Sequence, residues 1–348
     1  MILRKLTIGF LGTNLGYAAL LRQLIERHTS HQWVWQAGNL HLCIDLCQKS
    51  VPNIILLDIA DTSLDAVLTV ADLRRQFKTS ILLMYQLTEC PTHRVFAALG
   101  AGAIDVLNLC MTDQQPSTSL VKAFVEKITL INKLTSESGH NDLRLSIRPA
   151  RSAAYPLVAI GASAGGPAAL VTLLKDLPRD VNAAFVVVQH IESIFARNLA
   201  QWLNEQCSLT VKIAQSGDVP EPGVVLIAGT EDHLVLTPKI QLEYIREPTD
   251  YAYRPSVDVF FNSAVAYWPD RLIGVLLTGM GRDGALGMRA IHTRGMQTLV
   301  QNQESCAVFG MPKAAIELHA AHPVVDIREM STELKKILGY QAPEEQLS

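Results

Sequence analysis

The chain has 348 residues, of which 49% are hydrophobic and only 18% are charged. This length fits two domains of ordinary size, and this composition argues against long disordered segments. The formal net charge of −3 argues against a nucleic-acid-binding protein, which normally carries a surplus of basic residues.

The first 135 residues alternate short apolar runs with amphipathic stretches. Five apolar runs are typical of strands, at residues 6–11, 33–37, 54–58, 81–85 and 105–107. Five amphipathic stretches are typical of helices, at residues 17–26, 42–49, 66–77, 91–99 and 117–134. This alternation predicts a small doubly wound α/β domain over residues 1–135, with a parallel sheet.

A polar segment of small residues follows at 136–154, and it has the composition of a linker. A second α/β domain with a doubly wound parallel sheet is predicted over residues 155–340. Residues 156–174 are uncharged, but three glycines and Pro167 interrupt them, which favours a strand, a turn and a helix over a membrane span. The first residues lack the pattern of a signal peptide, so we expect a cytoplasmic protein that does not insert into membranes.

Six cysteines are scattered along the chain without a C-x-x-C pair. Such scattering is typical of small buried core residues in a reducing compartment. Cys43 and Cys47 lie four residues apart, but no pair of histidines or cysteines completes a metal site around them. The sequence therefore predicts neither a metal site nor a cofactor.

Three reactive side chains stand just after apolar runs in the second domain. Ser163, His190 and Asp283 follow, in this order, the runs at residues 156–160, 184–188 and 272–277. Such runs are typical of parallel strands that are buried on both faces. Because ligands of open α/β sheets bind beyond the carboxyl ends of the strands, we expect the three side chains to converge at one edge. Together they are the parts of a nucleophilic hydrolase.

Ser163 lies within a G-x-S-x-G pattern, in which a strained strand-to-helix turn exposes the serine hydroxyl. Free backbone N–H groups at this turn, such as that of Ala164, are candidates to stabilise an oxyanion. His190 would take the Ser163 proton as general base, and Asp283 would orient the imidazole. Taken singly, the three have simpler interpretations: a glycine-rich turn, a structural histidine and a turn aspartate.

The order of these residues along the chain is serine, histidine, aspartate. The α/β-hydrolases run serine, acid, histidine, so the chain is not predicted to be an ordinary member of that class. A dinucleotide site is also disfavoured, because G-x-G-x-x-G would need a glycine in place of Ser163.

Six short motifs stand out along the second domain. They are Ile160-Gly161-Ala162-Ser163, Gln189-His190, Arg254-Pro255-Ser256-Val257-Asp258, Leu277-Thr278-Gly279-Met280-Gly281, Asp283-Gly284 and Phe309-Gly310-Met311-Pro312. In order and spacing they resemble those of the chemotaxis protein-glutamate methylesterases, in which a flavodoxin-type receiver domain precedes a methylesterase domain. The resemblance implies hydrolysis of glutamate γ-methyl esters on methyl-accepting chemoreceptors, and many members of the family also deamidate receptor glutamines.

The resemblance also implies roles for further residues and for partners. The backbone N–H of Met280 becomes a candidate oxyanion donor, while its side chain fits a core position equally well. His233 and Arg254 become candidates to line the substrate groove, although a surface role fits each of them as well. The implied partners are the cytoplasmic domains of chemoreceptors and a chemosensory histidine kinase.

The first domain departs from a working receiver. Asp58, after the third predicted strand, matches the phosphoacceptor. The positions that would hold Mg²⁺ and contact the phosphoryl group carry Gly12, Thr13, Tyr85 or Gln86, and Leu109. Since Mg²⁺ prefers carboxylate oxygens, we expect a degenerate receiver in which Asp58 is phosphoacceptor-like but non-functional. Asp61, in the following loop, is the remaining acidic candidate.

The leading hypothesis is thus a serine hydrolase that acts in chemosensory adaptation. A non-catalytic chemosensory adaptor is the alternative: the degenerate receiver favours it, and the complete set of Ser163, His190 and Asp283 opposes it. A nucleotide-binding α/β protein is a third hypothesis, which the serine at position 163 disfavours.

Overall fold

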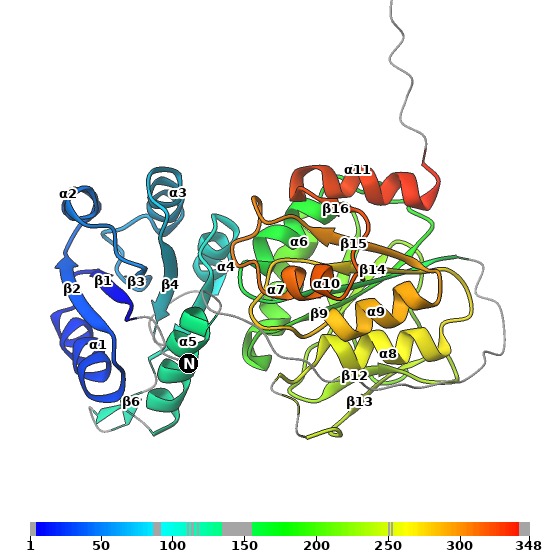
Figure 1. The fold of residues 1–348 in the computed structure, drawn as a ribbon, viewed down its shortest axis with the longest axis horizontal. Helices are drawn as coiled ribbons and strands as arrows, with labels where there is room; N and C mark the ends of the chain where they lie inside the picture. The colour runs from blue at the N-terminus through cyan, green and yellow to red at the C-terminus, as the bar shows by residue number, and fades with distance from the viewer. Residues whose placement is uncertain are drawn as a thin grey trace, which may run out of the picture. The chain divides into compact units, whose positions relative to one another are not determined.

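The computed structural model describes residues 5–85, 92–109, 111–112, 115–116, 118–133, 155–249, 251 and 253–340. The chain separates into two compact units, Met1–Gly139 and His140–Ser348. The segment predicted as a linker, residues 136–154, lies outside the described residues. Figure 1 shows that each unit is an α/β fold, as predicted from the sequence.

The first unit contains a five-stranded parallel sheet in the order β2-β1-β3-β4-β5 (Figure 1). Its strands are β1 (Thr7–Leu11), β2 (Gln32–Ala37), β3 (Ile54–Asp58), β4 (Ser80–Tyr85) and β5 (Asp105–Asn108). Its helices are α1 (Leu15–His28), α2 (Leu40–Lys49), α3 (Ala66–Gln76), α4 (Thr92–Gly100) and α5 (Thr118–Lys133). A short antiparallel pair, β6 (Met111–Thr112) and β7 (Gln115–Pro116), precedes α5. This strand order is that of flavodoxin-type folds, which confirms the predicted fold class.

Local sequence explains where these elements form. Strand β3 is buried along its whole length, as its uninterrupted apolar run predicts for a parallel strand packed on both faces. Asn14, Asn39 and Asp65 precede α1, α2 and α3, and each side chain accepts a hydrogen bond from the first turn of its helix. The five strands and five helices begin and end within two residues of the predicted positions.

The second unit contains a seven-stranded parallel sheet in the order β10-β11-β9-β8-β14-β15-β16. Its strands are β8 (Leu157–Ala162), β9 (Ala184–Gln189), β10 (Thr210–Ile213), β11 (Val224–Ile227), β14 (Leu272–Leu276), β15 (Gln297–Gln301) and β16 (Val324–Val325). An antiparallel pair is formed by β12 (His233–Leu236) and β13 (Leu242–Ile245). The helices are α6 (Gly166–Leu174), α7 (Ser193–Gln206), α8 (Val257–Tyr267), α9 (Ala285–Thr293), α10 (Met311–Glu317) and α11 (Ile327–Leu338).

The uncharged stretch at residues 156–174 forms strand β8, a turn and helix α6, as predicted. Among the described residues, no helix combines the length and the apolar character needed to cross a bilayer.

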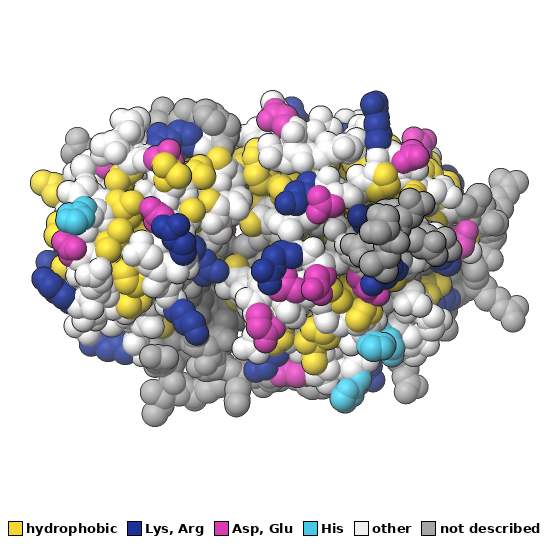
Figure 2. Space-filling model, turned by 90° about the horizontal axis from the view of Figure 1, so that it is seen from above, with side chains coloured by type: hydrophobic (Ala, Val, Ile, Leu, Met, Phe, Trp, Pro, Cys, Tyr) yellow, Lys and Arg dark blue, Asp and Glu magenta, His cyan; other side chains and the backbone are white. Residues whose placement is uncertain are grey.

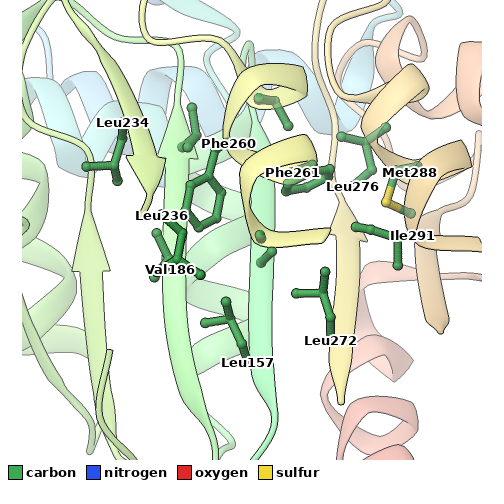
Figure 3. Close-up of a cluster of buried hydrophobic side chains, with 14 of the residues drawn as sticks. Leu157, Val186, Leu234, Leu236, Phe260, Phe261, Leu272, Leu276, Met288 and Ile291 are labelled. Atoms are coloured by element: carbon green, nitrogen blue, oxygen red, sulfur yellow. The ribbon is translucent and has the colours of Figure 1, made fainter. Parts of the chain in front are cut away.

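A large core fills the space between the sheet and helices α8 and α9 (Figure 3). Leu157, Val186 and Leu276 project from β8, β9 and β14 toward this space. Phe260 and Phe261 of α8 meet them there, and all five side chains are fully buried. Figure 1 shows α8 and α9 on one side of the sheet and α6 and α11 on the other. The central strands are therefore covered on both faces, and only their ends are open to chemistry.

The visible face in Figure 2 carries Lys and Arg side chains interspersed with Asp and Glu. This mixture agrees with the small net charge of −3 and forms no basic stripe of the kind that marks a nucleic-acid interface on that face.

Candidate active site

The three candidate catalytic residues follow three neighbouring strands. In the sheet order β9-β8-β14, His190 follows β9, Ser163 follows β8, and Asp283 lies in the loop between β14 and α9. Backbone hydrogen bonds tie these strand ends together, from His190 N to Ala162 O at 3.0 Å and from Ser163 N to Thr278 O at 3.0 Å. The convergence expected from the sequence at one edge of the sheet is therefore what the topology produces.

The turn that carries Ser163 is tight and well supported. Gly165 has a φ of 76°, a left-handed conformation that glycine adopts without steric cost. The N–H of Gly166 closes the turn on Ser163 O at 2.8 Å. The side-chain amide of Gln189 donates to the same oxygen at 2.9 Å and to His190 O at 3.0 Å. Gln189 thus holds the serine turn and the histidine strand in a common position.

His190 and Asp283 form a buried pair. His190 Nε2 lies 2.8 Å from Asp283 Oδ2, and the two side chains are 8% and 6% exposed. A carboxylate in this position both orients an imidazole and stabilises its protonated form.

Asp283 is held by the N-terminus of helix α8. Its Oδ1 accepts hydrogen bonds from Ser256 Oγ at 2.8 Å and from Asp258 N at 3.0 Å, and its Oδ2 accepts from Val257 N at 2.7 Å. The N–H of Gly284 adds a fourth donor at 3.1 Å. Burial opposes ionisation of Asp283, but the hydrogen bond and charge of His190, followed by these donors, keep its pKa below the ordinary value.

The tautomer of His190 follows from this pairing. Because Asp283 is an ionised acceptor, His190 Nε2 must carry the hydrogen, and the lone pair of the neutral ring lies on Nδ1. His190 Nδ1 is buried and makes no hydrogen bond to any residue that the structure describes, Ser163 included. An unpaired nitrogen with a free lone pair, one residue from the strand end, is suited to accept a proton.

The loop after β14 runs directly past Ser163. A Cβ on Gly279 would lie 2.8 Å from Ser163 Cβ and 2.2 Å from Met311 Sδ, so only glycine fits there without a shift. Within the described parts of the chain, the N–H groups of Ala164 and Met280 donate no hydrogen bond. Two unpaired N–H groups beside the serine fit the predicted oxyanion donors. The Met280 side chain itself is buried at 2% exposure, as its alternative core interpretation predicts.

The two residues predicted to line the substrate groove lie in different environments. His233 is fully buried, its Nδ1 accepts from Ser256 N at 3.0 Å, and its Nε2 donates to Pro248 O at 2.9 Å. Both ring nitrogens are thus engaged, which favours a supporting role behind the α8 terminus over substrate contact. Arg254 is exposed and lies two residues before Ser256, the residue that caps α8.

The sequence alone indicates no role for Ser256 or Gln189. Ser256 directly precedes helix α8, and its hydroxyl also accepts from Val259 N at 3.3 Å, the usual position of a capping serine. A serine in this position was a recognisable signal of a helix start, and helix starts bind anions. No comparable signal marks Gln189, because its partners depend on how β8 and β9 pair.

Asp258, in the first turn of α8, is a second buried acid in the same network. It is 5% exposed, and its Oδ1 accepts from Gly287 N at 2.7 Å. Burial, and after it the negative charge of Asp283, raise the pKa of Asp258 to about 8. At neutral pH Asp258 is therefore mostly a neutral acid beside the Asp283 carboxylate.

In the first unit, the surroundings of Asp58 are closed. Asp58 ends strand β3 and is 2% exposed. A Cβ at Gly12 would lie 2.6 Å from Asp58 Cβ, so no acidic side chain fits at that position without a shift. Tyr85 and Leu109 are fully buried, and Gln86 lies outside the described residues.

The remaining acid, Asp61, is already engaged. Thr13 donates to Asp61 Oδ2 from its N–H at 2.9 Å and from its hydroxyl at 2.7 Å. Ser63 donates to Asp61 Oδ1 from its N–H at 2.9 Å and from its hydroxyl at 2.5 Å. These bonds link the loops that follow β1 and β3, and they lower the pKa of Asp61 although partial burial opposes the shift. Over the described parts of the chain, no three acidic, histidine or cysteine side chains gather as metal ligands.

Comparison with known proteins identifies the family. The family model described as CheB methylesterase matches residues 158–334. A protein-glutamate methylesterase/protein-glutamine glutaminase of Burkholderia orbicola is 42% identical over 315 residues, which are 90% of this chain and 94% of the relative. One of Pseudomonas aeruginosa is 38% identical over 318 residues, with coverages of 91% and 95%. The solved catalytic domain of Thermotoga maritima CheB methylesterase is 33% identical, with a TM-score of 0.50, and covers 53% of this chain and 100% of that one.

The second unit is thus a methylesterase-type α/β domain, and the match of full-length relatives extends over the first unit as well. The chain belongs to the CheB methylesterase family, which makes it an enzyme of the methylesterase class, as the motifs predicted.

Gly279→Ala tests the close contact beside the serine. The added methyl group would press on Ser163 and Met311, so we expect a loss of stability of about 1–3 kcal/mol. We also expect slower labelling of Ser163 by a fluorophosphonate. Gly38→Ala, where a Cβ meets nothing within 4 Å, is the control for both thermal unfolding and labelling. Equal behaviour of the two variants would contradict the packing argument.

Asp258 predicts a dependence of stability on pH. Its folded pKa of about 8 lies above its unfolded value of about 4, so the folded state holds the extra proton between these values. Stability should then fall as pH rises through this interval. The lowered pKa of Asp283 affects stability in a different pH range. The stabilisation that ionised Asp283 contributes is lost only as pH falls below the ordinary range of a carboxyl.

The isosteric Asp258→Asn cannot ionise and should lose less stability between pH 5.5 and pH 8.5 than the parent chain, by several degrees in Tm. The exposed Asp176→Asn is the matched control and should follow the parent. A Tm difference between the two pH values that is the same in all three proteins would exclude Asp258 as its source.

The closed surroundings of Asp58 predict that beryllofluoride with Mg²⁺ does not bind there. Among the residues that the structure describes, no carboxylate is available to complete the cation site, because Gly12 and Thr13 supply none and Asp61 is occupied. Titration calorimetry on the full chain measures this, with Asp58→Asn as control. Saturable binding that Asp58→Asn abolishes would show that the phosphoacceptor site still works.

Proposed function

We propose that this chain is a serine hydrolase that removes methyl esters from glutamate side chains in the cytoplasmic domains of methyl-accepting chemoreceptors. The same chemistry would deamidate receptor glutamines, and both activities would serve a chemosensory adaptation system that includes a histidine kinase. The relatives named protein-glutamate methylesterase/protein-glutamine glutaminase support the substrate class. The observation that carries the proposal is the buried His190–Asp283 pair, at the edge where Ser163 also lies.

The acylation step uses the free nitrogen of His190. Ser163 Oγ attacks the ester carbonyl carbon while its proton passes to His190 Nδ1, which Asp283 keeps available by holding Nε2–H. The carbonyl oxygen becomes an oxyanion, for which the N–H groups of Ala164 and Met280 are the proposed donors. The imidazolium of His190 then returns the proton to the departing methoxide, and methanol leaves.

Deacylation repeats the same transfers with water. Water attacks the acyl carbon, gives its proton to His190 Nδ1, and leaves a glutamate carboxyl group as Ser163 recovers its hydroxyl. With a glutamine substrate the first leaving group is ammonia, and the remaining steps are identical. No step needs a cofactor, because every proton moves between the substrate, water and these side chains.

Substitution of the nucleophile tests the proposal. Ser163→Ala should lower methanol release from methylated receptor membranes by a factor on the order of 10⁴–10⁶, because the three residues act as a unit. Its thermal stability should be close to that of the parent chain, because the hydroxyl donates no hydrogen bond to a described residue and lies on a turn.

Ser208→Ala, an exposed serine elsewhere in the same unit, is the matched control and should keep full activity. Methanol release by Ser163→Ala at the parental rate would reject the mechanism. Receptor binding by a parent chain that releases no methanol would instead support the non-catalytic adaptor.

A further inference from the structure

The imidazole of His190 is held on its face as well as at its edge. The ring of Tyr253 stacks on it, with centroids 4.2 Å apart and planes inclined by only 5°. Asp283 holds the edge through Nε2, so the two contacts together define both the position and the plane of the ring. Tyr253 is half-buried, and it screens one face of His190 from water.

The segment that carries Tyr253 is anchored by the network that holds Asp283. Three residues further on, Ser256 hydrogen-bonds Asp283 through its hydroxyl and His233 through its N–H. His233 also donates to Pro248 O, and its ring makes a T-shaped contact with Tyr251 at a centroid distance of 5.9 Å. A shift of Tyr253 would therefore disturb the support of Asp283, which makes the stack a built part of the site.

The hydroxyl end of the Tyr253 ring lies next to the loop that carries Met280, the proposed oxyanion donor. A Cβ on Gly281 would lie 3.2 Å from Tyr253 Oη and 3.4 Å from Cε2, which is close packing without a clash. Gly281 directly follows Met280 in the chain. One aromatic ring thus spans from the proposed base to the loop beside the nucleophile.

An aromatic face attracts a neighbouring positive charge through its quadrupole. In the proposed acylation step His190 becomes positive as it takes the proton of Ser163, so an aromatic face there favours the transition state of that step. We propose that Tyr253 is a positioning residue whose ring fixes the plane of the His190 imidazole and stabilises its protonated form. This proposal rests on the proposed function of Ser163 and His190.

The pH profile is a suitable measure, because few titratable groups are linked to His190 by the contacts of the described residues. They are Asp283, which is bonded to it directly, Asp258, which is linked through Asp283, His233, which is linked through Ser256 and Asp283, and the phenol of Tyr253. Tyr253→Phe removes the phenol and keeps the ring, whereas Tyr253→Leu removes the ring. The difference between these variants therefore isolates the stack.

Kinetics with methylated receptor membranes give the first test. We expect Tyr253→Leu to lower kcat by a factor on the order of ten with little change in KM. The acid limb of its kcat/KM profile should move to lower pH, because the imidazolium loses a stabilising contact. Tyr253→Phe should match the parent chain in all three quantities. Tyr267→Leu, a half-buried tyrosine near the far end of α8, is the control for a general effect of the substitution.

A second measurement does not depend on turnover. In protein labelled at histidine ring carbons, the His190 signal is assigned by its absence in His190→Ala and followed by NMR against pH. Its titration midpoint should move to lower pH in Tyr253→Leu and stay in place in Tyr253→Phe. This result stands even if no receptor substrate is cleaved, so a failure of the proposed function is seen separately.

An unchanged midpoint in Tyr253→Leu, or an equal loss of kcat in the Phe and Leu variants, would overturn the proposal. An unchanged midpoint would show that the Tyr253 ring does not stabilise the imidazolium of His190. An equal loss of kcat would assign the effect on catalysis to the hydroxyl of Tyr253. A rise in KM alone would make Tyr253 a wall of the substrate groove and would reject its action on His190.

Discussion

The buried carboxylate of Asp283 is the constraint on which the rest of the site depends. Such a group costs several kcal/mol in lost hydration unless charges and hydrogen bonds compensate it. Here the first turn of α8 compensates it, through the hydroxyl of Ser256 and the N–H groups of Val257 and Asp258. The partial positive charge of a helix N-terminus adds to this effect. The ionised Asp283 then sets the tautomer of His190, and so decides which ring nitrogen is available to accept a proton.

Glycines let the segments of the site approach one another closely, because they have no side chain. A Cβ at Gly161 would lie 2.3 Å from Val257 Cγ1, and one at Gly284 would lie 2.7 Å from the same atom. The end of strand β8 and the loop before α9 therefore both pack directly on the first residue of α8. Gly279 allows the same closeness beside Ser163. The apolar core under α8 holds the helix in this position, so packing far from the chemistry maintains the geometry of the site.

The two units show that a fold and its chemistry depend on different residues. The first unit keeps a buried parallel sheet and capped helices, and these need only apolar strands and capping side chains. A cation site needs clustered carboxylates, and around Asp58 the room for one of them is gone. Asp61 bonds to Thr13 and Ser63 instead, which joins the loops that follow β1 and β3.

The sequence by itself determined the elements and the place of the reactive groups. Uninterrupted apolar runs identify buried parallel strands, and parallel strands end at the same edge, so the sequence predicts that Ser163, His190 and Asp283 lie together. Only the tertiary structure decided how they are supported. Asp283 meets Ser256 across 27 residues, and Tyr253 meets His190 across an even longer stretch of chain. Such contacts depend on strand order and on the direction of each side chain, and neither leaves a periodic signal in the sequence.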